Sequence, residues 1–278
     1  MSGMPPQEQG ARRQMALITG ASSGIGYELA KLFARDGYDL ALVARDRQKL
    51  DALAQAMRRQ HGISASVLPA DLSLPEAPET VWRALEASPV DVLVNNAGFG
   101  AYGAFARTEL AEQLRMIQVN ATALTHLTRL FLPGMIQRGR GKILNVASTA
   151  AFQPGPLMAV YYASKAYVLS FSEAVANELR GSGVSVTALC PGPTTTDFQR
   201  RAGIERTRLM RGRIMDAETV ARAGYRGLLS GRTVVVPGLR NRLLSVAVRL
   251  PPRDAVTQMV RSIQEQRQAP DESNQGDR

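Results

Sequence analysis

Two side chains four residues apart, Tyr161 and Lys165, give the clearest chemical signal in this sequence. Residues 160–169 contain no Gly or Pro and predict a helix, on which residues i and i+4 share one face. A fixed ammonium beside a phenol favours the phenolate, which would bring the pKa of the tyrosine closer to neutrality. Ser148 follows the apolar run 143–147 and is expected at the carboxyl end of a strand, where open α/β sheets bind ligands.

A lone Tyr-x-x-x-Lys more often marks a surface tyrosine beside a solvated lysine, so the surrounding motifs decide its meaning. Near the start of the chain, Gly20, Gly24 and Gly26 follow the apolar run 15–19 and precede a predicted helix at 27–36. Glycines let the backbone approach a phosphate, and a helix N-terminus offers N–H groups and a positive dipole end. The spacing TGxxxGxG differs from the usual GxGxxG fingerprint. This turn predicts a phosphate site for a dinucleotide.

Strands and helices alternate along the chain, which predicts βαβ units and a parallel sheet with right-handed crossovers. No internal repeat or linker divides the sequence. We expect strands at 15–19, 39–44, 64–70, 91–94, 142–147, 184–190 and 233–236. We expect helices at 27–36, 46–59, 75–87, 108–137, 160–180 and 216–230.

The composition is ordinary for a globular protein, with 278 residues, 45% apolar and 21% charged. No apolar run is long enough to cross a membrane, and residues 1–14 do not have the pattern of a secretion signal. The single cysteine, Cys190, lies in a predicted core strand and allows no internal disulfide, which agrees with a reducing cytoplasm. His61 and His126 are the only histidines, and no metal site is expected.

A net charge of +10 raises the question of a nucleic-acid partner. The basic residues are 30 arginines and 4 lysines, spread along nearly the whole chain, with few aromatics to stack bases. No helix-turn-helix signature accompanies them. We therefore interpret the charge as a compositional bias and expect no nucleic-acid partner.

Several motifs stand in a fixed order: TGASSGIG at 19–26, NNAG at 95–98, Asn120, Ser148, Tyr161 with Lys165, and PGPTTT at 191–196. This ordered set resembles the classical short-chain dehydrogenase/reductase family over roughly residues 15–240. The resemblance implies one Rossmann-type α/β domain with a doubly wound parallel sheet of strand order 3-2-1-4-5-6-7. It also implies a catalytic tetrad of Asn120, Ser148, Tyr161 and Lys165, and a homodimer or homotetramer.

The reaction that follows is NADP(H)-dependent interconversion of a carbonyl and a secondary alcohol. Tyr161 would supply the proton, and Lys165 would lower its pKa and bind the nicotinamide ribose. Ser148 would hold the carbonyl oxygen, and Asn120 would anchor a water, although a mid-helix Asn can also be simply solvated. Tyr162 cannot pair with Lys165 in this way because its i+4 neighbour is Ala166. The alternative is a non-catalytic NADP-binding regulator, which would not need Tyr161 and Lys165.

The end of the second strand bears on the cofactor, because an acid there binds the ribose of NAD and an arginine accommodates the phosphate of NADP. Arg45 follows that strand, and we interpret Asp46 as the N-cap of the next helix, so NADP is favoured over NAD. Thr195 or Thr196 could instead cap the following helix. The expected cofactor contacts are Thr19, Gly20, Ser22, Ser23, Gly24, Ile25, Gly26, Arg45, Asp71, Leu72, Asn96, Ala97, Gly98, Tyr161, Lys165, Pro191, Gly192, Thr194 and Thr196.

Residues 197–213 occupy the place of a lid and hold six arginines, which predict either a grip on an anionic substrate or a solvated basic loop. Opposite the lid, Phe99, Tyr102, Phe152 and Leu157 are expected to form an apolar pocket wall.

We assign residues 15–238 to the nucleotide-binding domain. The rest of the chain divides into three pieces. Residues 1–14 are expected to be flexible and 267–278 disordered. Residues 239–266 read as two helices with a break at Pro251 and Pro252. These helices could cover the pocket, pack in a dimer, or rest on a membrane surface, in that order of preference.

Overall fold

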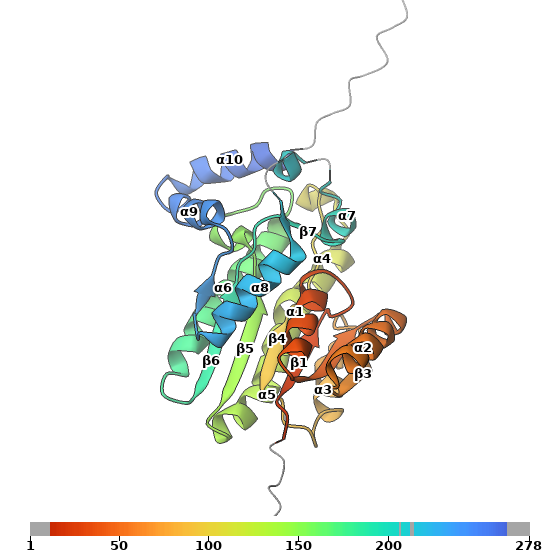
Figure 1. Cartoon of the computed structure of the whole chain (residues 1–278). Helices are drawn as coiled ribbons and strands as arrows, with labels where there is room; N and C mark the ends of the chain where they lie inside the picture. Colours follow the sequence, from red (N-terminus) through yellow and green to blue (C-terminus); the bar gives the residue numbers. More distant parts are fainter. Residues whose placement is uncertain (1–11, 206, 212–213, 266–278) are drawn as a thin grey trace, which may run out of the picture.

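The computed structural model describes residues 12–205, 207–211 and 214–265, and its centre is a parallel sheet of seven strands (Figure 1). The strand order is β3-β2-β1-β4-β5-β6-β9, with every neighbouring pair parallel. This confirms the doubly wound Rossmann-type sheet, with β9 in the place of the expected seventh strand. The strands are β1 (Met15–Thr19), β2 (Asp39–Ala44), β3 (Ala65–Pro69), β4 (Val92–Asn95), β5 (Gly141–Val146), β6 (Val184–Leu189) and β9 (Val234–Val235).

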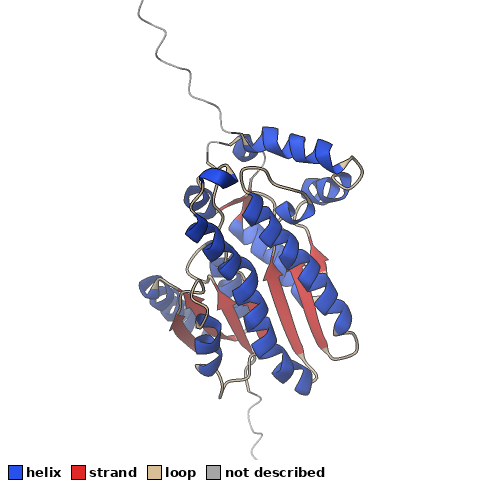
Figure 2. Cartoon of the chain, turned by 180° about the vertical axis from the view of Figure 1, so that it is seen from behind, coloured by secondary structure: helices blue, strands red, loops and turns tan. Residues whose placement is uncertain are grey.

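Helices cover both faces of the sheet, because side chains alternate between its two faces along each strand. Ile18 of β1 packs with Phe33 and Leu50 under one helical layer, whereas Leu17 packs with Leu127 under the other. The first layer consists of α1 (Gly24–Arg35), α2 (Arg47–His61) and α8 (Ala217–Leu229). The second consists of α3 (Ala77–Arg83), α5 (Leu124–Gln137) and α6 (Ala159–Glu178), on the side of the sheet that Figure 2 views.

The long helix expected at 108–137 is interrupted. A 3₁₀ turn, η1 (Phe105–Arg107), precedes α4 (Leu110–Ile117), and a π-helical segment, η2 (Gln118–Ala123), joins α4 to α5. A π segment widens the helix by one residue per turn and commonly occurs at functional sites. The sequence prediction missed this segment because it contains no Gly or Pro that would mark an interruption.

Local signals set most helix boundaries. Asp46 is the N-cap of α2, as predicted, and its carboxylate accepts a hydrogen bond from the Lys49 N–H at 3.1 Å. Gly62 ends the same helix in the left-handed conformation, with φ 62°. The helix expected from residue 27 starts earlier, at Gly24, inside the glycine turn.

The lid and the two C-terminal helices lie beyond the carboxyl ends of the strands (Figure 1). A two-stranded sheet, β7 (Thr194–Thr195) with β8 (Met215–Asp216), closes the base of the lid, and the prediction missed it. The lid itself contains α7 (Phe198–Ala202) and the 3₁₀ turn η4 (Arg208–Arg211). The two helices expected after residue 239 are α9 (Leu239–Ala247) and α10 (Arg253–Gln264).

Parts of four predicted segments lie outside the described residues: 1–11 of the N-terminal piece, Arg206, Gly212 and Arg213 of the lid, Gln266 of the C-terminal helical piece, and 267–278 of the tail. Arg12, the first described residue, pairs with the buried Asp91, at 2.8 Å between Nη2 and Oδ2.

Candidate active site

The glycine turn after β1 is held against the end of β4 by an asparagine. Asn96 donates from Nδ2 to the carbonyl oxygens of Thr19 at 2.9 Å and Gly20 at 3.2 Å. A Cβ on Gly26 would lie 2.4 Å from that amide nitrogen, so the close packing requires glycine. Gly20 has φ 66° and Gly24 has φ 58°, conformations that glycine adopts without strain. The turn therefore presents backbone next to the N-terminus of α1.

Thr19 supports this turn from behind. Its hydroxyl accepts from the N–H groups of Asn96 and Ala97, both at 3.0 Å, and donates to the Val94 oxygen at 3.2 Å. Thr19 is buried, and neither it nor Gly26 lines either of the two cavities described below. Both residues hold the glycine turn in place, and neither contributes to the surface that would contact a phosphate.

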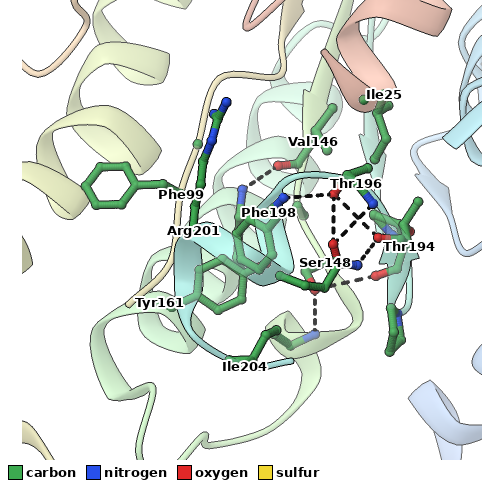
Figure 3. Close-up of a pocket in the computed structure, with 18 of the residues that line it drawn as sticks. Ile25, Phe99, Val146, Ser148, Tyr161, Thr194, Thr196, Phe198, Arg201 and Ile204 are labelled. Carbon is green, nitrogen blue, oxygen red and sulfur yellow. Dashed lines mark hydrogen bonds between the residues drawn. The ribbon is translucent and has the colours of Figure 1, made fainter. Parts of the chain in front are cut away.

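The expected catalytic residues converge at the ends of β5 and α6. Helix α6 carries Tyr161 and Lys165 on one face, with the Lys165 ammonium 5.9 Å from the centroid of the Tyr161 ring. Lys165 is buried and donates to the Val146 carbonyl at 2.8 Å. Ser148 lies two residues beyond the end of β5 and beside Tyr161 in Figure 3. Its hydroxyl accepts from the Ala150 N–H at 3.1 Å and donates to the Pro191 oxygen over a long 3.4 Å.

The π segment η2 places Asn120 in the interior, so it is not solvated. Its Oδ1 accepts from the Phe99 N–H at 3.1 Å, and its Nδ2 donates to the Phe99 oxygen at 2.9 Å and to Ser164 Oγ at 3.0 Å. A Cβ added to Gly98 would lie 3.0 Å from Asn120 Oδ1 and 3.3 Å from Lys165 Nζ. Asn120 therefore joins α6 to the loop after β4, next to the ammonium.

The pKa of Tyr161 differs from the expectation. Burial raises it above the ordinary value of a phenol, and a hydrogen bond with Ser148 opposes the rise only in part. The ammonium of Lys165 does not offset that burial, and burial lowers the pKa of Lys165 itself to about 8. The expected lowering of the Tyr161 pKa by Lys165 is therefore wrong for this structure, because both groups are removed from water.

Two adjoining cavities open onto these residues. The first, of about 260 Å³, is lined by Ser148, Tyr161 and Lys165, and the second, of about 540 Å³, extends toward the end of β2. Both touch the glycine turn, and together they form one continuous trough. The expected cofactor contacts that line the trough are Gly20, Ser22, Ser23, Gly24, Ile25, Arg45, Asp71, Leu72, Asn96, Ala97, Gly98, Tyr161, Lys165, Pro191, Gly192, Thr194 and Thr196.

The second cavity has a charged wall, in which Asp46, Asp71 and Glu112 stand among the cations. Arg45 lines it, as do Lys49, Arg115 and Arg201. Asp46 also borders it, but its carboxylate is engaged by the Lys49 N–H and by the Lys49 ammonium at 3.3 Å. The neighbouring Asp71 has a lowered pKa, because hydrogen bonds from Ser73 and the charges of Arg45 and Arg115 outweigh burial.

The lid and the apolar wall match the prediction only in part. Of the four expected wall residues, only Phe99 lines the trough of the described structure. The hydroxyl of Tyr102 donates to the Gln264 backbone oxygen at 2.9 Å, and the ring of Phe152 lies under the Arg249 guanidinium at 5.6 Å. Leu157 has a left-handed backbone conformation, with φ 66°.

The arginines of the lid separate into two groups. Arg201 lines both cavities, whereas Arg200 lines neither. Both pair with Asp197, Arg200 at 2.9 Å and Arg201 at 3.7 Å. A grip on an anion by both Arg200 and Arg201 is therefore not supported. Arg206 and Arg213 lie outside the described residues.

The C-terminal helix α10 covers the far end of the first cavity. Its Gln264 is buried, lines that cavity and donates from Nε2 to the Tyr162 hydroxyl at 2.6 Å. Val256 and Val260 of α10 pack in the same apolar cluster as Tyr162. Tyr162 is therefore a structural residue of the pocket wall, and covering the pocket is the role that the structure supports for this helix.

The described residues hold no cluster of three or more His, Cys, Asp or Glu side chains that could bind a metal. Within the same part of the chain, no helix has both the length and the apolar composition needed to cross a bilayer. Cys190 is buried, and burial raises the pKa of its thiol to about 12, which is unfavourable for a nucleophile.

A sequence model described as short chain dehydrogenase matches residues 14–206. The chain belongs to the short-chain dehydrogenase family. This is an oxidoreductase family, and the match spans the glycine turn, the candidate catalytic residues and the PGPTTT motif and ends inside the lid.

Individual members of the family support the assignment. A short-chain dehydrogenase from Sphingobium yanoikuyae, solved in complex with NADPH, is 38% identical, with a TM-score of 0.78, over 93% of this chain and 99% of that one. A bulky-bulky ketone specific alcohol dehydrogenase from Comamonas testosteroni is 34% identical, with a TM-score of 0.73, over 85% of this chain and 92% of that one. The very-long-chain 3-oxoacyl-CoA reductase of Anas platyrhynchos is 36% identical over 190 residues, which are 66% of this chain and only 61% of that protein.

In this short-chain dehydrogenase, the sequence did not predict most of the residues that close the substrate end, which is the end of the first cavity beside Tyr161. These residues come from the loop before α6, from the lid and from α10: Gln153, Met158, Phe198, Ile204, Met210 and Gln264. The ring of Phe198 lies beside that of Tyr161 in Figure 3, and their centroids are 5.2 Å apart. The only sequence signal for these residues was the apolar character of the lid and of the C-terminal helices. That character does not show which side chains point into the cavity.

Proposed function

We propose that this short-chain dehydrogenase is an NADP(H)-dependent oxidoreductase that interconverts a carbonyl and a secondary alcohol, with Tyr161 as general acid and base. The observation that supports this most is the meeting of Tyr161, Ser148 and Lys165 on the wall of a trough that continues into the glycine turn. A non-catalytic NADP-binding regulator would need the glycine turn but would have no use for a phenol and an ammonium at that wall.

The residues present fit a phosphorylated dinucleotide. The glycine turn brings backbone to the N-terminus of α1, where the helix dipole favours an anion. Farther along, the cations Arg45, Lys49 and Arg115 line the part of the trough that lies beside β2. The carboxylate of Asp46 is already bonded to Lys49, so it does not offer a ribose the acceptor that NAD binding would use. These features support NADP over NAD.

Bound NADPH would supply the hydride. At neutral pH the buried phenol of Tyr161 carries its proton and can donate it to the carbonyl oxygen on which charge develops. The hydroxyl of Ser148 lies beside the Tyr161 phenol and donates to Pro191 only over a long 3.4 Å, so its proton is available to hold the same oxygen. Lys165 would bind ribose hydroxyls, and Asn120 would position Lys165 and the loop at Phe99.

The substrate end supports an apolar carbonyl compound, because Met158, Phe198, Ile204 and Met210 form its wall. Two relatives reported above, named for bulky ketones and for very-long-chain 3-oxoacyl-CoA, point to the same class. The test is NADPH oxidation by the purified protein with a panel of ketones of increasing apolar size, and with the same panel under NADH. We expect turnover that rises with apolar size. Tight NADPH binding without turnover of any ketone would favour the regulator instead.

The pH dependence of this reaction is a second prediction. Reduction requires protonated Tyr161, whose raised pKa keeps it protonated through neutrality, and charged Lys165, whose pKa is about 8. We expect kcat/KM for reduction to be constant below that value and to fall by up to about tenfold per pH unit above it. Alcohol oxidation requires the phenolate and should rise with pH.

Tyr162→Phe is the control for this profile. The pKa of Tyr162 is raised by burial to about 12, so its loss should leave the shape of the curve unchanged. A reduction rate that increases from neutral to alkaline pH would show that Lys165 does not act as the cation.

The same proposal includes a homo-oligomer. Leu110, Leu114 and Ile117 of α4 are exposed along one side of the helix, and Tyr167 of the adjacent α6 is exposed beside them. Apolar helix faces of this kind usually pack on protein, which supports assembly through α4 and α6. A cytoplasmic location also remains a prediction.

A further inference from the structure

Helix α9 has its apolar side turned outward. Leu239, Leu243 and Val246 recur at helical spacing and are 73%, 62% and 58% exposed, and Leu250 in the following turn is 85% exposed. The opposite side of the helix consists of Asn241, Ser245 and Val248, of which Ser245 is buried against the protein. An ordinary surface helix has the reverse arrangement, with leucines inside and polar residues outside.

Only cations flank this apolar stripe. Residues 239–253 include Arg240, Arg242, Arg249 and Arg253, all exposed, and contain no Asp or Glu. None of these four arginines forms an ion pair within the part of the chain that the structure describes. Some arginines on other helices, such as Arg83 and Arg222, pair with a glutamate four residues away, whereas others, such as Arg226, form no ion pair in the described chain. The stripe and its unpaired arginines thus form one surface.

This surface lies at the end of the molecule that holds the site. In Figure 1, α9 and α10 lie together above the carboxyl ends of the strands. Helix α9 contacts η3 (Thr149–Phe152), the turn that begins immediately after Ser148, and Arg249 lies over the ring of Phe152. Helix α10 is occupied in covering the pocket, whereas the outer side of α9 covers nothing within the described chain.

We propose that the outer face of α9, formed by Leu239, Leu243, Val246 and Leu250 with their flanking arginines, docks on the surface of an anionic lipid bilayer. A helix with leucines on one face and arginines at its edges lies in the plane of the interface, with its leucines in the acyl boundary and its cations at the head groups. Charge complementarity selects this occupant over a second copy of the chain. Two such faces brought together would set eight unpaired arginines against each other around a small apolar stripe.

The test is co-sedimentation of the full-length protein with vesicles of phosphatidylcholine alone and with vesicles containing about 30% phosphatidylglycerol, at low and at high salt. We expect at least about tenfold stronger partition to the anionic vesicles, weakened by salt. Leu243→Ser with Val246→Ser should lower that partition at least about tenfold, because it removes apolar contact without changing the charge. No turnover is needed for this readout, so it is independent of the proposed reaction.

A matched pair of charge variants separates docking from general attraction of a basic protein. Arg240→Ser with Arg242→Ser removes two charges from α9, and Arg226→Ser with Arg232→Ser removes two exposed charges in and after α8. We expect several-fold weaker binding from the α9 pair only. Equal losses from both pairs, or unchanged binding of the leucine and valine variant, would overturn the proposal. The wild-type protein could also run as a dimer in gel filtration that Leu243→Ser with Val246→Ser converts to a monomer. That result would assign the face to a second copy of the chain instead.

Discussion

Tyr161→Phe is expected to lower kcat for carbonyl reduction by about 10²–10⁴-fold while NADPH still binds. The substitution removes the only hydroxyl of the described structure that combines exposure to the first cavity, contact with Ser148 and a shared helix face with Lys165. Burial raises the pKa of this phenol, so at neutral pH the proton to be donated is present on the enzyme, and phenylalanine has none to give. Steady-state kinetics and NADPH fluorescence titration separate the loss of turnover from the binding of cofactor.

The matched control is the neighbouring phenol. Tyr162 lies in the same helix turn and its ring is 6.0 Å from that of Tyr161, but its hydroxyl accepts from Gln264 and its ring packs against Gly155. Tyr162→Phe should leave kcat within a few-fold and reduce the free energy of unfolding by about 1 kcal/mol, the net value of one hydrogen bond. If Tyr162→Phe abolished turnover and Tyr161→Phe did not, the assignment of the acid would be wrong.

Lys165→Arg extends the same prediction. Lys165 is buried with its ammonium on the Val146 carbonyl, and burial brings its pKa to about 8. A guanidinium is larger, planar and charged at every accessible pH. The variant should therefore be nearly inactive, and a fully active Lys165→Arg would show that the shape and pKa of Lys165 do not matter.

Arg45→Ala is expected to lower kcat/KM with NADPH by about ten- to a hundredfold and to leave the value with NADH nearly unchanged. The 2′-phosphate of NADP needs a cation where NAD presents only a hydroxyl, and Arg45 is exposed on the wall of the second cavity, directly after β2. One charge-assisted hydrogen bond contributes about 1.5–3 kcal/mol, and about 1.4 kcal/mol corresponds to a factor of ten. Ala44→Asp should go further and turn the preference toward NADH, because a carboxylate repels the phosphate and accepts from ribose hydroxyls.

Arg47→Ala is the control for charge alone. Arg47 is also exposed and lies two residues farther along, but it does not line either cavity of the described chain. Its removal should leave the ratio of the two cofactors unchanged. If kcat/KM of the unmodified protein were tenfold or more higher with NADH than with NADPH, Asp46 would have to bind the ribose hydroxyls, despite its bonds to Lys49.

Short-range patterns determined most of the architecture. Apolar runs bounded by Gly, Pro and Asp placed β1 and β2 at the observed residues, and the spacing of Tyr161 and Lys165 put both on one face of α6. Asp46 was assigned as an N-cap from sequence, and its carboxylate has that role. These features were predictable because they depend on residues within one helical turn or one strand, where backbone geometry decides which side chains are neighbours.

Tertiary structure decided what happens to those side chains. The pKa of Tyr161 rises because segments far away in the sequence, among them Phe198 of the lid, exclude water from it. Asn120 bonds to Phe99 because a π segment redirects it, and nothing in the sequence of η2 marks that segment. The pocket wall comes from α7 and α10. The exposed side of α9 could not be recognised from the sequence, because the periodicity of its apolar residues shows that the helix has an apolar face but not whether other parts of the protein cover that face. Burial depends on the packing of distant segments, and a single sequence read locally does not contain that packing.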